Sequence, residues 1–172
     1  MTFATAPEVL RTGAPQAAFP AELRLFRPHL FFYRPWEGRG EITDARGRRI
    51  GGFTVSGEGR ASSALGHIEQ HWVFENGVEH VAEWEIISGT GRDYRARDVR
   101  SGATARGRTQ RDGFLWVMRV KSPTPFGLRT CRVATLYRMI DEDTAEAETL
   151  TTVFGVVPLG RMKATYRRLG RS

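Results

Sequence analysis

The segment Ile68–Ile86, IEQHWVFENGVEHVAEWEI, alternates apolar and charged residues on both sides of a turn. A two-residue turn at Asn76 and Gly77 would mix tryptophans with carboxylates on the faces of the hairpin. A three-residue loop from Glu75 to Gly77, with Gly77 in the left-handed conformation, separates them. One face then carries Ile68, Gln70, Trp72, Phe74, Val78, His80, Ala82, Trp84 and Ile86, and the other carries His67, Glu69, His71, Glu79, Glu83 and Glu85. We interpret the first face as the inner wall of an all-β barrel.

The same alternation continues along the chain between closely spaced turns, which is typical of a meandering antiparallel sheet. It predicts about ten strands, over residues 36–42, 48–59, 68–74, 78–86, 93–99, 103–108, 114–121, 129–139, 145–154 and 161–169. We expect a proline-containing loop at 122–127, a bulge between Glu148 and Phe154, and a bend at 155–160. Asp93 and Asp98 are expected to form surface ion pairs with nearby arginines.

The expected strand 103–108 has an inner face of Ala103, Ala105 and Gly107, almost bare of side chains. Such a wall either accommodates a bulky neighbour such as Trp116 or leaves a cavity. Only the second outcome provides room for a ligand.

The N-terminal part divides into an arm and a plug. Residues 1–18 are rich in Ala, Pro and Thr without periodicity and are expected to form a flexible arm, while residues 19–172 form one barrel domain. Pro20 is expected to open a short helix that reaches Phe26, and Pro28 to end or kink it. Leu30, Phe31 and Phe32 are too apolar to remain exposed, so we expect this segment to plug one end of the barrel.

Composition bounds the class of protein. No run of about 18 apolar residues is present, so no membrane-spanning helix is expected. Met1–Phe19 lacks the pattern of a secretory signal, and we expect a cytoplasmic protein. The net charge is +7, and every basic residue except Lys121 and Lys163 is arginine. This charge indicates a solvated outer face or, as the alternative, a phosphate-binding patch, without a strong nucleic-acid signal. The single cysteine, Cys131, is expected to be a small buried residue.

Aromatic residues and glycines recur in a definite order over residues 30–169. The sequence places them at Phe31, Phe32, Gly38, Gly40, Gly47, Phe53, Trp72, Phe74, Gly77, Trp84, Tyr94, Gly107, Trp116, Phe154, Gly155 and Gly160, with Asp98 and Val99 between. This order resembles a bacterial domain family of unknown function with a lipocalin-like (calycin-type) barrel, many of whose members are classed as candidate lipoproteins. The resemblance implies a single antiparallel up-and-down barrel with a short N-terminal helix. Gln70 stands where that family prefers an acidic residue, and the lipid-anchored start is missing.

A candidate ligand site follows from the predicted inner face. Gln70 and His80 lie at the diagonal distance of roughly 7–8 Å across their hairpin and could orient the polar end of a ligand. The expected apolar surroundings are Trp72, Trp84, Tyr94, Trp116, Met118 and Tyr137. In the alternative interpretation, Gln70 and His80 satisfy each other or a buried water, and the barrel is filled.

Catalytic and metal signals are weak. His67 and His71 share an outer strand face beside glutamates, so no metal site is expected there. A haem would have His80 as its axial ligand, with no second motif to support it, and no cofactor is expected. We find no nucleophile elbow and no phosphate-cradling glycine loop.

Three hypotheses remain at this point. The first is a barrel that binds a small hydrophobic molecule, such as a fatty acid or an isoprenoid. The second is a filled barrel that acts as a structural or interaction module through its arginine-rich exterior. The third is an enzyme or haem binder that uses His80, and an enzyme is the less favoured interpretation. The sequence carries no signal of the oligomeric state.

Overall fold

The computed structural model describes residues 26–62, 65–88 and 92–170. The expected arm at 1–18 and the expected helix start at Pro20 lie outside these residues. Within them the chain forms one short helix and ten strands. The elements are α1 (Pro28–Phe32), β1 (Trp36–Asp44), β2 (Arg49–Ser62), β3 (Leu65–Phe74), β4 (Glu79–Ser88), β5 (Asp93–Asp98), β6 (Thr104–Gln110), β7 (Gly113–Thr124), β8 (Gly127–Met139), β9 (Thr144–Val153) and β10 (Val157–Arg168).

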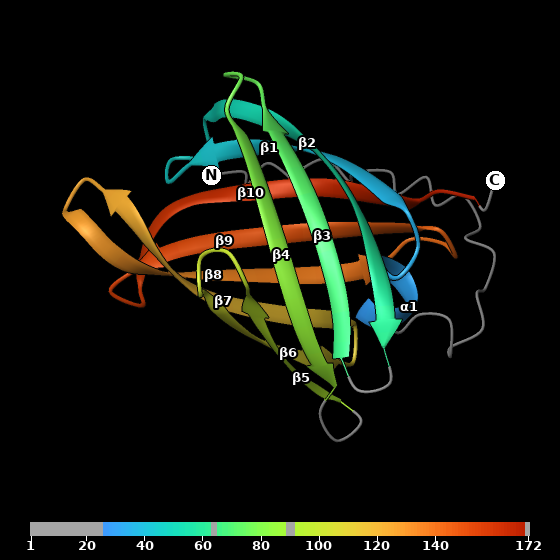
Figure 1. Ribbon diagram of the computed structural model, residues 1–172. Coiled ribbons are helices and arrows are strands. Elements are labelled where there is room, and N and C mark those ends of the chain that lie inside the picture. The colour runs from blue at the N-terminus through green and yellow to red at the C-terminus, as the bar shows by residue number, and fades with distance from the viewer. Residues whose placement is uncertain (1–25, 63–64, 89–91, 171–172) are drawn as a thin grey trace, which may run out of the picture.

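The ten strands close into one antiparallel barrel in which each strand pairs with its neighbours in sequence and β1 pairs with β10. The expected all-β up-and-down barrel is therefore confirmed. Figure 1 shows α1 at one end of the barrel and the β7–β8 hairpin projecting at the other. No helix in the described ranges is long and apolar enough to cross a membrane.

The β3–β4 hairpin has the register that its alternation predicts. Trp72 lies opposite His80, and Ile68 lies opposite Trp84. The loop spans Glu75–Gly77, and Gly77 has a φ of +80°. On the outer face, His67 Nε2 lies 2.8 Å from a Glu83 carboxylate oxygen, so the charged side chains face away from the core as expected.

Several segments differ from the expected strand limits. β10 begins at Val157, so most of the bend expected at 155–160 belongs to a strand. β7 continues to Thr124 and β8 begins at Gly127, so most of the loop expected at 122–127 belongs to a long hairpin. The register shift expected between Glu148 and Phe154 lies instead in β10, between Pro158 and Gly160. Proline cannot donate to a β-ladder, which is why a bulge in the strand that contains Pro158 is favoured over one in β9.

The helix begins where we expected one to end. Pro28 occupies the first turn of α1, where its missing N–H leaves no helical hydrogen bond unmade. The expected role as a plug is confirmed for Phe31 and Phe32, which are buried with Phe26 at one end of the barrel, whereas Leu30 is 53% exposed and its expected burial was wrong. Phe26 stacks on Tyr137 with ring centroids 5.0 Å apart.

The barrel wall is incomplete at the opposite end because β5 and β6 are short. β4 pairs with β5 only from Trp84 to Ser88, and β6 pairs with β7 only as far as Arg119. In the described ranges no strand therefore covers His80–Ala82 of β4 or Val120–Thr124 of β7 on this side. The barrel is closed by strand pairing near α1 and open at the far end, which we call the mouth.

Candidate ligand-binding cavity

A cavity of about 990 Å³ lies inside the barrel. This volume is at the upper end of the range of roughly 300–1,000 Å³ that is typical of small-molecule sites. Its floor is formed by Pro28, Phe32, Phe114 and Tyr166 near α1. Exposed side chains at the far end, including His80, Thr104 and Lys121, also border it, so the cavity opens at the mouth.

Most of the predicted site residues line this cavity. The structure brings together Gln70, Trp72, His80, Trp84, Trp116, Met118 and Tyr137. Tyr94 is the exception. Its ring is buried edge-on against Phe114 at 5.3 Å and lies behind the cavity wall.

The bare wall of β6 produces both of the outcomes that we considered. Gly107 lies under Phe114 and Trp116, and any Cβ at that position would overlap their rings. The small residue thus accommodates two aromatic side chains at the floor. Toward the mouth Ala103 borders the cavity, so the interior is not filled by the barrel's own side chains.

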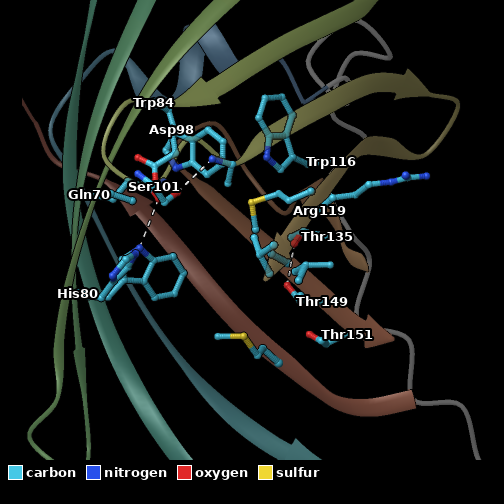
Figure 2. A pocket seen from close by; sticks show the side chains of 18 of the residues that line it. Gln70, His80, Trp84, Asp98, Ser101, Trp116, Arg119, Thr135, Thr149 and Thr151 are labelled. Atoms are coloured by element: carbon cyan, nitrogen blue, oxygen red, sulfur yellow. Dashed lines mark hydrogen bonds between the residues drawn. The ribbon is translucent and has the colours of Figure 1, made fainter. Parts of the chain in front are cut away.

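Gln70 and His80 do not satisfy each other. The Trp72 indole N–H donates to the Gln70 side-chain oxygen at 3.4 Å (Figure 2). The His80 imidazole is exposed at the mouth, and it has no hydrogen-bond partner in the part of the chain that the structure describes. Both side chains can therefore bond to a ligand, Gln70 through its amide N–H groups.

Asp98 was expected on the surface, but it is buried at 3% exposure beside the cavity. Its carboxylate accepts hydrogen bonds from the backbone N–H of Glu83 at 3.1 Å, of Arg100 at 3.3 Å and of Ser101 at 3.2 Å, and from the Ser101 hydroxyl. Desolvation raises the pKa of Asp98, but these hydrogen bonds outweigh it, so the pKa lies below its usual value. Asp98 thus holds the β5–β6 loop at the mouth, whereas Asp93 forms the expected surface ion pair with Arg108. The alternation of the sequence does predict that Asp98 faces inward, because Asp98 lies on the same strand face as Tyr94 and Ala96.

A strip of threonines forms a polar patch that the sequence analysis did not assign to the site. The hydroxyl oxygens of Thr135 and Thr149 lie 2.9 Å apart, and Thr151 follows on the same face of β9. Figure 2 shows this strip across the cavity from Gln70 and His80. The parity of Thr135 placed it inside, while the bulge expected in β9 obscured the parity of Thr149 and Thr151.

Two tyrosines, the buried Tyr166 and the partly buried Tyr137, make the floor uncharged. Tyr137 and Tyr166 are hydrogen-bonded to each other, and desolvation raises the pKa of Tyr137 to about 12. Desolvation, together with the neighbouring Tyr137, raises the pKa of Tyr166 well above its ordinary value. The floor therefore presents neutral rings and hydroxyls at physiological pH.

The described residues contain no group of three or more His, Cys, Asp or Glu side chains placed to hold a metal ion. His67 and His71 each contact a different glutamate on the outer surface. Cys131 is fully buried, as expected.

One comparison with a solved structure supports the fold. The S-type phycobiliprotein lyase CPES of Guillardia theta matches with a TM-score of 0.58 and 7% identity, over 81% of this chain and 89% of that chain. EF1p2_mFAP2b bound to DFHBI matches with a TM-score of 0.43 and 8% identity, over 83% of this chain and 98% of that chain. No curated protein matches. A family model described as "Protein of unknown function (DUF3833)" matches residues 14–168.

Proposed function

The chain belongs to the DUF3833 family of proteins of unknown function, and we propose that its lipocalin-like barrel binds a small hydrophobic molecule that carries one polar group. The observation that carries this proposal is the cavity of about 990 Å³, which is sealed by aromatic rings at α1 and open at the mouth. Burial of apolar ligand surface would supply the binding free energy, at roughly 25 cal/mol per Å².

The chemistry of the wall favours an uncharged or weakly polar ligand body. Trp72, Trp84, Trp116 and Met118 contribute apolar surface along its length. Of the ionisable groups that line the cavity, the Asp98 carboxylate is saturated by hydrogen bonds and the Tyr137 phenol stays neutral, while His80, Arg119 and Lys121 are exposed toward the mouth. A charged group deep in the barrel would lose its hydration without a partner, which is costly.

The polar end of the ligand belongs near the mouth. Gln70 has amide donors to offer, and the His80 imidazole is without a partner in the described ranges. A fatty acid or an isoprenoid alcohol fits this arrangement, with its head group at Gln70 or His80 and its chain directed toward Phe32 and Tyr166. The Thr135–Thr149 pair adds a second polar contact halfway along the opposite wall.

The test begins with the protein as purified. Native mass spectrometry should detect added mass from a retained ligand, and tryptophan fluorescence should change on titration with a long-chain fatty acid or an isoprenoid alcohol. Ala82→Phe should abolish the response, because Ala82 lines the cavity opposite Gln70. Ala134→Phe, on the outer face of β8, is the matched control and should leave it unchanged. No fluorescence response to any such ligand, or an equal loss in both variants, would refute the proposal.

The other two hypotheses receive less support. A barrel filled by its own side chains does not agree with the cavity. For an enzyme, His80 would need a partner that holds its tautomer, and none is found among the described residues.

A further inference from the structure

Exposed apolar side chains concentrate at the mouth of the barrel. Five strand connections meet there, namely β1–β2, β3–β4, β5–β6, β7–β8 and β9–β10. Each adjoins at least one large exposed apolar residue, and together these are Ile50, Val78, Val99, Phe126, Leu128, Phe154, Val156 and Val157. At the α1 end the described exposed apolar residues are only Leu30, Ile140 and Leu169. Exposed apolar surface that is gathered in one place marks an interaction site.

Two of these hairpin tips contact each other. The rings of Phe126, between β7 and β8, and Phe154, between β9 and β10, lie 5.6 Å apart. They are 48% and 61% exposed, and the neighbouring Val156 is 80% exposed. Phe154 has a φ of +54°, a strained conformation for a residue with a bulky side chain. We call Phe126, Leu128, Phe154 and Val156 the apolar tip.

The parts of β7–β10 nearest the apolar tip bear cations and no carboxylates, and the two glutamates of β9, Glu146 and Glu148, lie farther along that strand. Residues 114–140 and 149–172 contain no Asp or Glu. The cations nearest the tip on these strands are exposed and have no ion-pair partner within the described ranges, and they are Arg119, Lys121, Arg129, Arg132 and Arg161. The carboxylates of neighbouring turns are paired instead, as Asp44 is with Arg48 and Glu75 with Arg49.

The placement of two of these arginines is unfavourable in the isolated protein. Arg119 lies directly opposite Arg132 in the β7–β8 ladder. Like charges in a cross-strand pair repel each other and destabilise the sheet. An anionic surface beneath the hairpin would relieve this repulsion.

We propose that the apolar tip and its flanking cations dock the mouth of the barrel onto an anionic lipid bilayer. Aromatic side chains with adjacent cations are the combination that interfacial anchors use, the rings entering the boundary between headgroups and acyl chains. Lys and Arg near such a surface are attracted by its negative potential. The docked orientation places the cavity mouth against the bilayer. The inference concerns the tip alone and does not depend on the cavity holding a ligand.

The test measures partition of the full chain onto vesicles of phosphatidylcholine with and without phosphatidylglycerol, by co-sedimentation. Binding should require the anionic lipid and weaken as salt is raised. Phe126→Ser combined with Phe154→Ser should weaken it about tenfold or more, because fully burying one phenylalanine corresponds to at least about tenfold in an equilibrium constant. Leu30→Ser combined with Ile140→Ser, at the α1 end, is the matched apolar control and should bind as the wild type does.

A second pair of variants tests the charges. Arg119→Gln combined with Arg132→Gln should weaken binding about fivefold for each cation removed. Arg95→Gln combined with Arg106→Gln removes another arginine pair that faces across a ladder, between β5 and β6, and should have little effect. Vesicle binding that is absent in the wild type, or lost equally in the control variants, would overturn the proposal. So would self-association of the wild type that the Phe126→Ser and Phe154→Ser substitutions abolish, since the tip would then be covered by a second copy. Ligand titrations of the tip variant in solution distinguish failure of this proposal from failure of the cavity proposal.

Discussion

Replacing Phe32 by alanine should destabilise the barrel more than the same change at Phe126 of the mouth. The ring is 6% exposed and forms the centre of the plug. Its centroid lies 5.0 Å from that of Trp36, 5.7 Å from that of Tyr137 and 6.3 Å from that of Tyr166. Phenylalanine-to-alanine changes in such cores cost about 3–5 kcal/mol of unfolding free energy.

Phe126→Ala provides a comparison with the same chemical change. Phe126 is 48% exposed, and its ring contact is with Phe154. Only about half of its surface is lost from water, so its truncation should cost about 1 kcal/mol. The two variants should therefore differ by about 3 kcal/mol, which corresponds to a difference in melting temperature of roughly 6–12 °C for a chain of this length.

Urea denaturation of the wild type and both variants measures this difference, provided that the slope m is the same for all three. A midpoint for Phe32→Ala equal to that for Phe126→Ala would refute the reasoning, because the plug would then contribute no more to stability than a half-exposed tip. A lowered m for Phe32→Ala alone would indicate that the native barrel has already opened at the α1 end.

Three further predictions concern the cavity wall. Trp84→Ala should cost about 3–5 kcal/mol, since the indole is 9% exposed and packs edge-on against Trp116; an unchanged denaturation midpoint would contradict this. Asp98→Ala should cost at least about 2 kcal/mol at neutral pH. Because the pKa of Asp98 is lowered in the folded protein, its contribution to the free energy of unfolding is present above the unfolded-state pKa and is lost as the pH falls through the folded-state pKa. A cost of Asp98→Ala that is the same in acid as at neutral pH would contradict this prediction. The pKa values of Tyr137 and Tyr166 are raised, so the folded protein should lose stability as the pH rises from about 10 toward about 12. Tyrosinate absorbance from these two residues in the native protein at a pH below about 10 would contradict this prediction.

The alternation of inward-facing and outward-facing side chains along each strand is the part of the fold that the sequence specifies most strongly. In the β3–β4 hairpin a shift of one residue would turn Trp72 and Trp84 outward and bury Glu83, so only one register is compatible with a core. The prediction held along the chain, through Trp116 and Met118 on β7 and through Met162 and Tyr166 on β10, all of which face inward. The number of strands followed from the same reasoning.

Local rules were weaker wherever two of them conflicted. Pro28 is compatible with either the end of one helix or the first turn of the next, and local sequence does not distinguish the two. Asp98 has the parity of a buried residue and the polarity of an exposed one. Its burial depends on four hydrogen bonds, three from the β5–β6 loop and one from the backbone of Glu83 on β4, and their geometry cannot be predicted from strand periodicity.

The sequence predicted either a cavity or a filled interior beside β6 and did not distinguish between them. Whether small side chains leave a void depends on the radius of the barrel, which is set by strand number and stagger as well as by side-chain volume. Gly107 shows the difficulty, since at that position two aromatic rings take up the space that glycine leaves. The residues toward the mouth, such as Ala82 and Ala103, have no such partner and border the open space.

One difference in strand length accounts for the main features of the mouth. β6 has 7 residues whereas β7 has 12, so the β7–β8 hairpin continues beyond the end of β6 without a neighbour on that side. The missing wall leaves the cavity open between β4 and β7, and the unsupported hairpin carries Phe126 away from the barrel. At the other end Arg168 bonds to Asp143 at 2.9 Å and to the Leu30 carbonyl at 3.3 Å, which ties the plug to the β8–β9 turn. Side-chain bonds therefore stabilise the closed end of the barrel, whereas the open end lacks strand pairing between β4 and β7. A ligand that enters by the mouth passes the same residues that we propose to contact the lipid surface.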